Sequence, residues 1–113
     1  NKIVYIADDA PNFSFDPIKC KYSRKFSGGS SCIEDSARVY EQQKVYLPTL
    51  LSIVEDNSNV KLLEIARYFC DATVCSMASN GALYYRDNNH LNLNGSKYLG
   101  KKLTEDYLFL APR

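Results

Sequence analysis

The strongest constraint on the fold is a continuous apolar run near the start of the sequence, from Lys2 to Ala7. The run is rich in β-branched residues and shows no alternation of polar and apolar positions. Such a run is typical of a strand in a parallel sheet that is covered on both faces. Residues 8–12 follow it with the composition of a loop. We therefore expect a strand buried on both faces at the start of an α/β fold.

Helical spacing dominates residues 34–56. Apolar and large side chains recur there at steps of three and four, at Tyr40, Gln43, Leu47, Leu50, Leu51 and Val54. Asp35 or Ser36 can cap the start of this helix, and Pro48 inside the pattern predicts a kink or a break. A second helix is expected from Leu93, with Asn92 as its N-cap. Its apolar face would comprise Leu99, Leu103, Tyr107 and Leu110.

Two further short strands are expected between the helices, at Val60–Ala66 and Ala82–Tyr85. Asn80-Gly81 marks a turn before the second of them, whereas Phe13–Asp35 shows no sustained period and is expected to be a loop. The resulting order of strand, loop, helix, strand, turn, strand and helix is typical of an open α/β sheet. Three strands make a thin sheet, so we expect further strands from residues outside this sequence.

The four cysteines form two local pairs in the sequence and permit three disulfide connectivities. We expect Cys20–Cys32 and Cys70–Cys75, because short loops close with the least loss of entropy. Disulfides indicate an oxidising compartment. A zinc site is the competing interpretation, but cysteine separations of twelve and five residues fit poorly with paired zinc knuckles.

Composition excludes several classes of function. The 113 residues include 14 basic and 13 acidic side chains, for a net charge of +1, which argues against a nucleic-acid partner. No apolar run approaches the length of a membrane span. No glycine-rich phosphate loop follows the first strand, so we expect no nucleotide cofactor. Asp8 and Asp9 could bind a cation, although a loop that caps the end of the sheet is the favoured interpretation.

One pair of residues has the spacing of a catalytic unit. His90, the single histidine, follows Asp87 by three residues, with Asn88 and Asn89 between them. Within one turn the carboxylate can meet one imidazole nitrogen, fix the tautomer and stabilise the imidazolium. Taken alone, this spacing is more often a surface histidine in a turn.

The surrounding residues change that interpretation. The stretch Leu83–Gly100 resembles the last sequence block of the SGNH hydrolase superfamily, and most closely the SGNH domains fused to acyltransferase-3 membrane proteins that O-acylate cell-surface polysaccharides. In that block an aspartate and a histidine three residues apart are followed by leucine, a small capping residue and glycine. The matching residues are Asp87, His90, Leu91, Asn92 and Gly95. The family usually has serine where Asn92 stands, and either residue can cap a helix.

This resemblance implies a three-layer α/β/α, flavodoxin-like sandwich, of which residues 1–113 would be the C-terminal part. It implies O-acyl transfer, with acetyl as the expected group, to hydroxyls of a polysaccharide such as lipopolysaccharide O-antigen, with Asp87 and His90 as catalytic residues. The implied partners are the upstream part of the SGNH domain, an acyltransferase-3 transmembrane domain and the polysaccharide acceptor. The implied location is the periplasmic or extracellular face of a bacterial membrane.

The sequence departs from the family at the nucleophile. No serine follows Gly-Asp, and Ser30, the one candidate flanked by glycines, is better explained as part of a linker. We therefore expect this chain alone to be nearly inactive in acyl transfer.

Two alternatives stay open, an SGNH esterase or hydrolase and a catalytically inactive module that binds glycan or a protein partner. Nine tyrosines would suit a sugar-binding surface, although packing is their commoner role.

Overall fold

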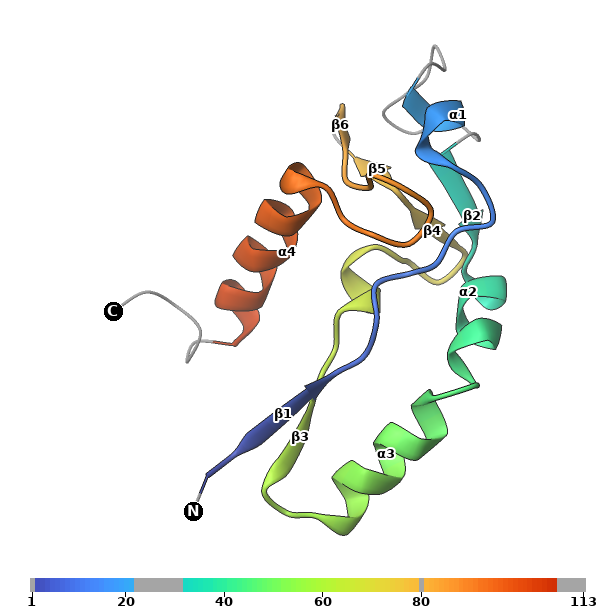
Figure 1. Ribbon diagram of the computed structural model, residues 1–113. Helices are drawn as coiled ribbons and strands as arrows, with labels where there is room; N and C mark the ends of the chain where they lie inside the picture. The colour runs from blue at the N-terminus through green and yellow to red at the C-terminus, as the bar shows by residue number, and fades with distance from the viewer. Residues whose placement is uncertain (1, 22–31, 80, 108–113) are drawn as a thin grey trace.

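The computed structural model describes residues 2–21, 32–79 and 81–107, and these residues form a mixed arrangement of helices and strands (Figure 1). The strands are β1 (Val4–Ala7), β2 (Ile33–Asp35), β3 (Val60–Leu63), β4 (Val74–Ser76), β5 (Ala78–Ser79) and β6 (Ala82–Leu83). The helices are α1 (Pro17–Lys21), α2 (Ser36–Gln43), α3 (Leu47–Asp56), the 3-10 turn η2 (Ala66–Tyr68) and α4 (Leu93–Asp106). The mixture of helices and strands is compatible with the α/β class predicted from the sequence.

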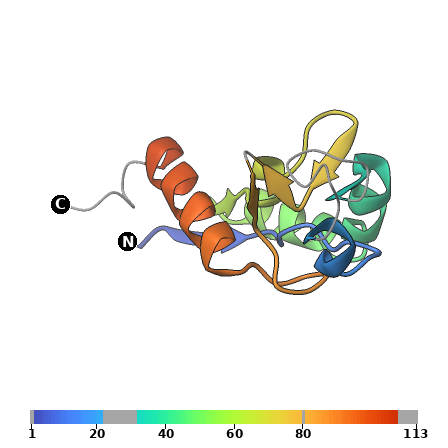
Figure 2. The same cartoon turned by 90° about the horizontal axis from the view of Figure 1, so that it is seen from above.

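The described strands pair as three two-stranded sheets. β1 and β3 are parallel, with Val4 opposite Val60 and Ala7 opposite Leu63, and α3 connects into β3 and packs against it. β2 pairs with β4 and β5 with β6, both antiparallel. Figure 1 shows the β1–β3 pair and α3 at one end of the molecule and the remaining strands at the other. Figure 2 shows a flattened molecule, whose principal extents are 51 × 36 × 22 Å.

Strand β1 differs from its prediction in burial. Its expected position was correct to within two residues, but Ile3 and Val4 are 62% and 47% exposed, and Tyr5 is 37% exposed. Among the described residues, β3 is its single strand neighbour, so one edge of β1 and much of its surface have no cover. The prediction that this strand is buried on both faces is therefore wrong for the described residues. Such burial depends on neighbouring elements, which cannot be read from the sequence of the strand itself.

The predicted helix over residues 34–56 is two helices, α2 and α3, separated by a turn at residues 44–46. Pro48 lies in the first turn of α3. Backbone N–H groups in the first turn have no hydrogen-bond acceptor within the helix, so proline is tolerated there although it lacks an N–H. Asp35 is the N-cap residue of α2, as the sequence allowed, but its side chain makes no capping hydrogen bond. The Ser36 hydroxyl donates instead to the Ala72 carbonyl, and its backbone N–H donates to Thr73.

The two remaining predicted strands were placed correctly but were too long, and the second helix begins at Leu93 as predicted, while Leu110 of its expected apolar face lies outside the described residues. The strands expected at Val60–Ala66 and Ala82–Tyr85 end at Leu63 and Leu83. The segment expected to be a loop, Phe13–Asp35, contains α1 and β2 in its described part. Gly81 adopts a φ of 77° in the turn between β5 and β6, a conformation that glycine adopts without strain. No helix within the described ranges has the length and apolar character needed to cross a membrane.

The hydrophobic core lies in the half of the molecule that holds β2, β4, β5 and β6. Its buried members are mainly aromatic, sulfur-containing and small side chains, namely Phe13, Cys20, Cys32, Val39, Phe69, Cys75, Met77, Ala78, Tyr84 and Tyr85. Phe69 makes edge contacts with Tyr84, Tyr85 and Tyr98, with ring centroids 5.6–6.3 Å apart. Such edge-to-face contacts stabilise aromatic clusters beyond the effect of burial alone.

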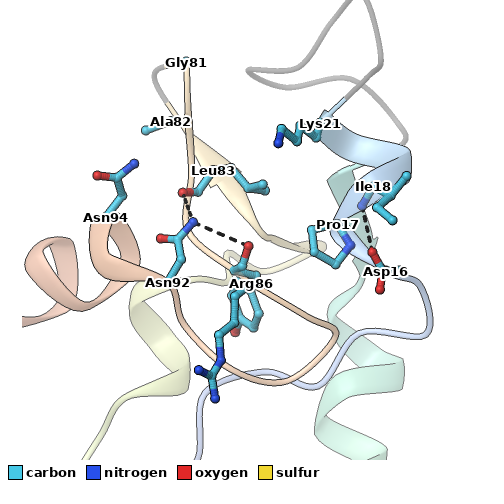
Figure 3. A pocket seen from close by; sticks show the side chains of 11 residues that line it. Asp16, Pro17, Ile18, Lys21, Gly81, Ala82, Leu83, Arg86, Asn92 and Asn94 are labelled. Carbon is cyan, nitrogen blue, oxygen red and sulfur yellow. Dashed lines mark hydrogen bonds between the residues drawn. The ribbon is translucent and has the colours of Figure 1, made fainter.

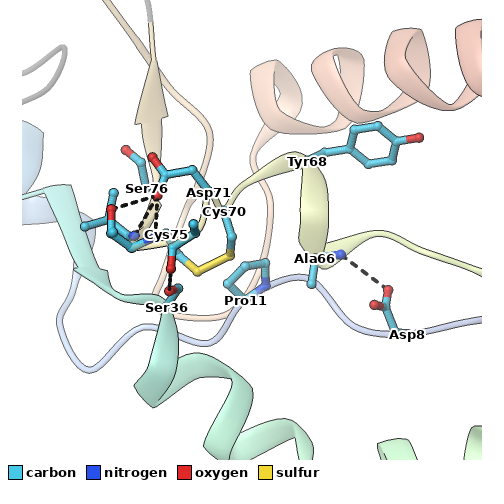
Figure 4. Close-up of a disulfide and its surroundings, with 12 residues drawn as sticks. Asp8, Pro11, Ser36, Ala66, Tyr68, Cys70, Asp71, Cys75 and Ser76 are labelled. Atoms are coloured by element: carbon cyan, nitrogen blue, oxygen red, sulfur yellow. Dashed lines mark hydrogen bonds between the residues drawn. A yellow bond between two sulfur atoms is a disulfide. The ribbon is translucent and has the colours of Figure 1, made fainter.

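Two disulfides reinforce this core. Cys20 at the end of α1 bonds Cys32, which directly precedes β2, and Cys70 bonds Cys75 in β4. These are the two pairs predicted from the sequence, and they use all four cysteines. The turn inside the second pair is held by Asp71, whose Oδ1 accepts hydrogen bonds from the N–H groups of Thr73 and Val74, both at 2.8 Å. Figure 4 shows this disulfide between α2 and η2.

A buried carboxylate joins the loop after β1 to strand β2. The Glu34 side chain is 8% exposed and accepts hydrogen bonds from the backbone N–H and the hydroxyl of Ser14, both at 2.7 Å. Arg38 on α2 completes the set of donors as an ion pair. Burial acts to raise the pKa of Glu34, but the bonds from Ser14 and Arg38 outweigh it and hold this pKa below its ordinary value of 4.5.

We expect Glu34→Gln to reduce the acid sensitivity of folding. A carboxyl whose pKa is lowered in the folded state stabilises the protein above its unfolded pKa, and this stability is lost as pH falls through the folded pKa. Urea unfolding between pH 7 and pH 3 should therefore show a smaller decrease in free energy below pH 4.5 for Glu34→Gln than for the wild type. Glu41→Gln, at a carboxylate that is 71% exposed, is the matched control and should retain the wild-type slope. Identical slopes for all three proteins would contradict the assignment.

Candidate active site

The predicted Asp-x-x-His unit lies in a closed turn between β6 and α4. The base of the turn is a bridge between Tyr85 and Leu91, and the Arg86 N–H donates to the His90 carbonyl at 2.9 Å. Strand β6 precedes the turn and α4 begins two residues after Leu91. The turn is therefore held at both ends by regular structure.

The Asp87 carboxylate organises the turn from within. Its Oδ1 accepts hydrogen bonds from the backbone N–H groups of Asn89 at 2.9 Å and His90 at 2.7 Å. The His90 ring turns back to the same carboxylate, with Nδ1 at 2.9 Å from Oδ2 and 3.1 Å from Oδ1. The structure thus brings together the two side chains predicted from their spacing.

The contacts of the pair favour one tautomer of the His90 ring. The Asn89 N–H makes the largest contribution to keeping the pKa of Asp87 below its ordinary value of 3.8, and the His90 side chain and N–H lower it further. An ionised carboxylate against Nδ1 requires a proton on that nitrogen, which leaves Nε2 of a neutral ring as an acceptor. The His90 side chain is 57% exposed, so a reacting hydroxyl can approach it. Such a ring can take a proton from a hydroxyl and return it.

The loop after β1 supports the turn from the core side. The buried Tyr85 hydroxyl donates to the Pro11 carbonyl at 2.8 Å, and its ring meets Phe13 edge-on at 4.9 Å. The Phe13 N–H donates to the Asn88 carbonyl at 2.8 Å, and the Asn88 amide donates back to the Phe13 carbonyl at 3.3 Å. These contacts could not be predicted from the sequence, because they join residues more than 70 positions apart. Residues such as Pro11 and Asn88 indicate that the chain turns at these positions, but they do not indicate which distant segment each turn contacts.

Asn92 and Gly95 fix the start of α4 against the turn. As predicted, Asn92 is the N-cap, and its Oδ1 accepts from the Gly95 N–H at 2.9 Å. Its Nδ2 also donates to the Leu83 carbonyl at 2.8 Å, a bond that the sequence did not indicate. Gly95 is buried, and a Cβ atom at this position would lie 2.1 Å from the Tyr84 carbonyl oxygen. Glycine is therefore required there so that the helix can approach the backbone of the strand.

A pocket of about 640 Å³ lies beside the turn, between α1 and β6 (Figure 3). Pro17 and Ile18 of α1 and Leu83 of β6 line it from opposite sides, as Figure 3 shows. Arg86 and Asn92, at the two ends of the Asp87–His90 turn, also line it. Its volume lies within the range of about 300–1,000 Å³ that is usual for small-molecule sites.

The other candidates from the sequence have different positions. Asp8 is half-buried, and its Oδ1 accepts from the N–H groups of Ile65 at 2.5 Å and Ala66 at 3.3 Å, so it caps η2 (Figure 4). Arg86 lies 4.0 Å from Asp87, at the limit of an ion pair. Ser30 lies outside the described residues. Among the residues that are described, the His90 side chain has its hydrogen bonds with Asp87 and none with a serine hydroxyl.

Comparison with known proteins gives one match. A family model described as SGNH domain (fused to AT3 domains) matches residues 1–105. The matched range includes the first strand, both disulfides and the whole Asp87–His90 turn. No curated protein and no solved structure matches the chain.

The close approach at Gly95 can be tested with two matched substitutions. Gly95→Ala would push a methyl group into the Tyr84 backbone, and we expect a loss of about 1–3 kcal/mol in the free energy of unfolding. Gly100→Ala, in the same helix, meets no atom within 4 Å and should stabilise the protein by up to about 1 kcal/mol. Urea denaturation measures both effects. A Gly95→Ala protein as stable as the Gly100→Ala protein would show that α4 does not rest on Tyr84.

Proposed function

Because the chain belongs to the family of SGNH domains fused to AT3 domains, a family of the acyltransferase and esterase type, we propose that it contributes the Asp-His pair of an O-acyltransferase. The observation that carries this proposal is the contact between His90 Nδ1 and Asp87 Oδ2 at 2.9 Å, on a ring that is 57% exposed. The acceptor is a hydroxyl of a cell-surface polysaccharide, and the transferred group is an acyl group, most simply acetyl.

In the proposed mechanism a serine hydroxyl attacks the carbonyl carbon of an acyl donor. His90 Nε2 takes the serine proton and delivers it to the leaving group, which generates an acyl-enzyme. The polysaccharide hydroxyl then loses its proton to the same nitrogen as it attacks, and the proton returns to the released serine. Asp87 stays ionised, holds the Nδ1–H tautomer and stabilises the imidazolium formed in each step.

The serine is proposed to come from another segment of the same SGNH domain, because the 113 residues contain no Gly-Asp-Ser run. The exposed apolar side chains of Val4 in β1 and of Ile3 just before it support this arrangement. Parallel strands are normally buried between covering elements, so a segment that adds strands to β1 would complete the flavodoxin-like, three-layer sandwich. In this proposal residues 1–113 are the C-terminal part of that domain.

Two features support the proposed setting. The pocket between α1 and β6 combines an apolar wall at Pro17 and Leu83 with polar groups such as Asn94, a combination that suits one sugar unit of a polysaccharide. The disulfides Cys20–Cys32 and Cys70–Cys75 suit an oxidising compartment, in agreement with a site on the periplasmic or extracellular side of a membrane. An AT3 transmembrane domain is the proposed partner that supplies the acyl group.

We expect His90→Ala and Asp87→Asn to abolish O-acylation by the intact membrane protein. Loss of a triad histidine or of its orienting carboxylate lowers turnover by about 10⁴-fold or more in well-characterised enzymes. The measurement is the acetyl content of the cell-surface polysaccharide, by NMR, with Lys97→Ala on exposed α4 as the control. Acylation at the wild-type level in either variant would refute the proposed roles. Release of free acetate without acylated polysaccharide would identify a hydrolase instead.

The Asp87–His90 contact can be tested on the 113-residue chain alone. Nitrogen-15 chemical shifts of the imidazole distinguish the two neutral tautomers, and we expect the proton on Nδ1 in the wild type because Asp87 accepts it. Asp87→Asn should shift the population toward the Nε2–H tautomer, since an amide can donate to Nδ1. Arg86→Ala, next in sequence and 4.0 Å from the carboxylate, should leave the tautomer unchanged. An Nε2–H ring in the wild type would exclude the proposed orientation.

A further inference from the structure

A second, smaller cavity lies between α2 and the loop after β1, away from the pocket in Figure 3. Its volume is about 30 Å³. The residues that line it are mostly polar, namely Asp9, Asn12, Gln42, Gln43 and Tyr46, and the apolar ones are Ala10 and Val39. The cavity therefore joins a helix of the core to the loop that supports the Asp87–His90 turn.

One of these side chains is buried without a partner. Gln43, the last residue of α2, is 6% exposed, and no acceptor among the described residues lies within hydrogen-bond distance of its Nε2. The neighbouring Tyr46 hydroxyl does not bond Gln43 and instead accepts a hydrogen bond from the Asp9 N–H at 3.1 Å. A buried amide N–H without a partner is costly, so native proteins almost always satisfy it with protein or ordered water.

The volume of the cavity and the polarity of its lining favour a water molecule over an organic ligand or an ion. A buried water needs only about 10–15 Å³ of such space and two to four polar partners, whereas an organic ligand needs far more space. An anion would face the Asp9 carboxylate, and a cation would face the Gln43 N–H group. Water can accept from Gln43 Nε2 and donate its two hydrogens to acceptors on the loop, such as the Asp9 carboxylate.

We propose that this cavity binds an internal water molecule that bridges Gln43 to the loop at residues 9–12. That loop carries Pro11 and leads directly into Phe13, and the backbone groups of these two residues bond Tyr85 and Asn88 at the Asp87–His90 turn. The bridging water thus connects α2 to the support of the turn. Gln43 is a positioning residue in this arrangement, and the inference holds whether or not the chain takes part in acyl transfer.

The experiment uses NMR on the nitrogen-15-labelled 113-residue chain. We expect cross-relaxation between the Gln43 side-chain amide protons and a long-lived water. In Gln43→Met, which keeps the length of the side chain but removes its polar atoms, this signal disappears and the melting temperature falls by about 4–8 °C. The Phe13 amide, bonded to Asn88, should exchange with deuterium roughly tenfold faster relative to the other core amides. Lys44→Met, at an exposed neighbouring side chain, should change none of these three quantities.

Several results would overturn the proposal. A dry cavity predicts the opposite stability change, because Gln43→Met would then remove an unsatisfied donor and raise the melting temperature. No water signal at the Gln43 amide, or no selective change at Phe13, would also reject it. A crystal structure with a bound atom about 2.3–2.6 Å from several oxygens would identify a cation instead of water.

Discussion

The buried hydroxyl of Tyr85 is the interaction on which the arrangement of the site depends. It donates to the Pro11 carbonyl at 2.8 Å from a side chain with no exposed surface, and burial raises the pKa of Tyr85 so that the hydroxyl remains a donor. The bond joins the loop after β1 to the strand that leads into the Asp87–His90 turn. Phe13 and Phe69 pack edge-on against the same ring. The Asp87–His90 turn, with its half-exposed histidine, therefore rests on a packed aromatic base.

Features set by interactions within a few residues could be predicted from the sequence. Asn92 caps α4 because its side chain reaches the N–H three residues ahead, and Asp87 reaches His90 within one turn. The two disulfides follow the same rule, since each joins cysteines that are near in sequence. The family resemblance added the catalytic interpretation of a spacing that would otherwise have favoured a surface histidine.

Features set by distant neighbours could not be predicted. The burial of β1 depends on which strands lie beside it, and within the described residues it has one such neighbour. Ser36 was a reasonable helix cap, but its hydroxyl bonds Ala72 across 36 positions of sequence. The bonds between Phe13 and Asn88 that support the site are also non-local. Gly95 was recognised only as part of a motif, because the Tyr84 carbonyl that excludes a side chain is visible only in three dimensions.

The uneven distribution of the core has a consequence for cooperativity. All fully buried apolar side chains of the core cluster, and both disulfides, lie outside β1, β3 and α3. Helix α3 has no buried residue despite the five aliphatic side chains at Leu47, Leu50, Leu51, Ile53 and Val54. We therefore expect the parallel pair and its helix to open at a lower free energy than the cross-linked half. We therefore expect a measured melting temperature to report chiefly on the cross-linked half of this chain.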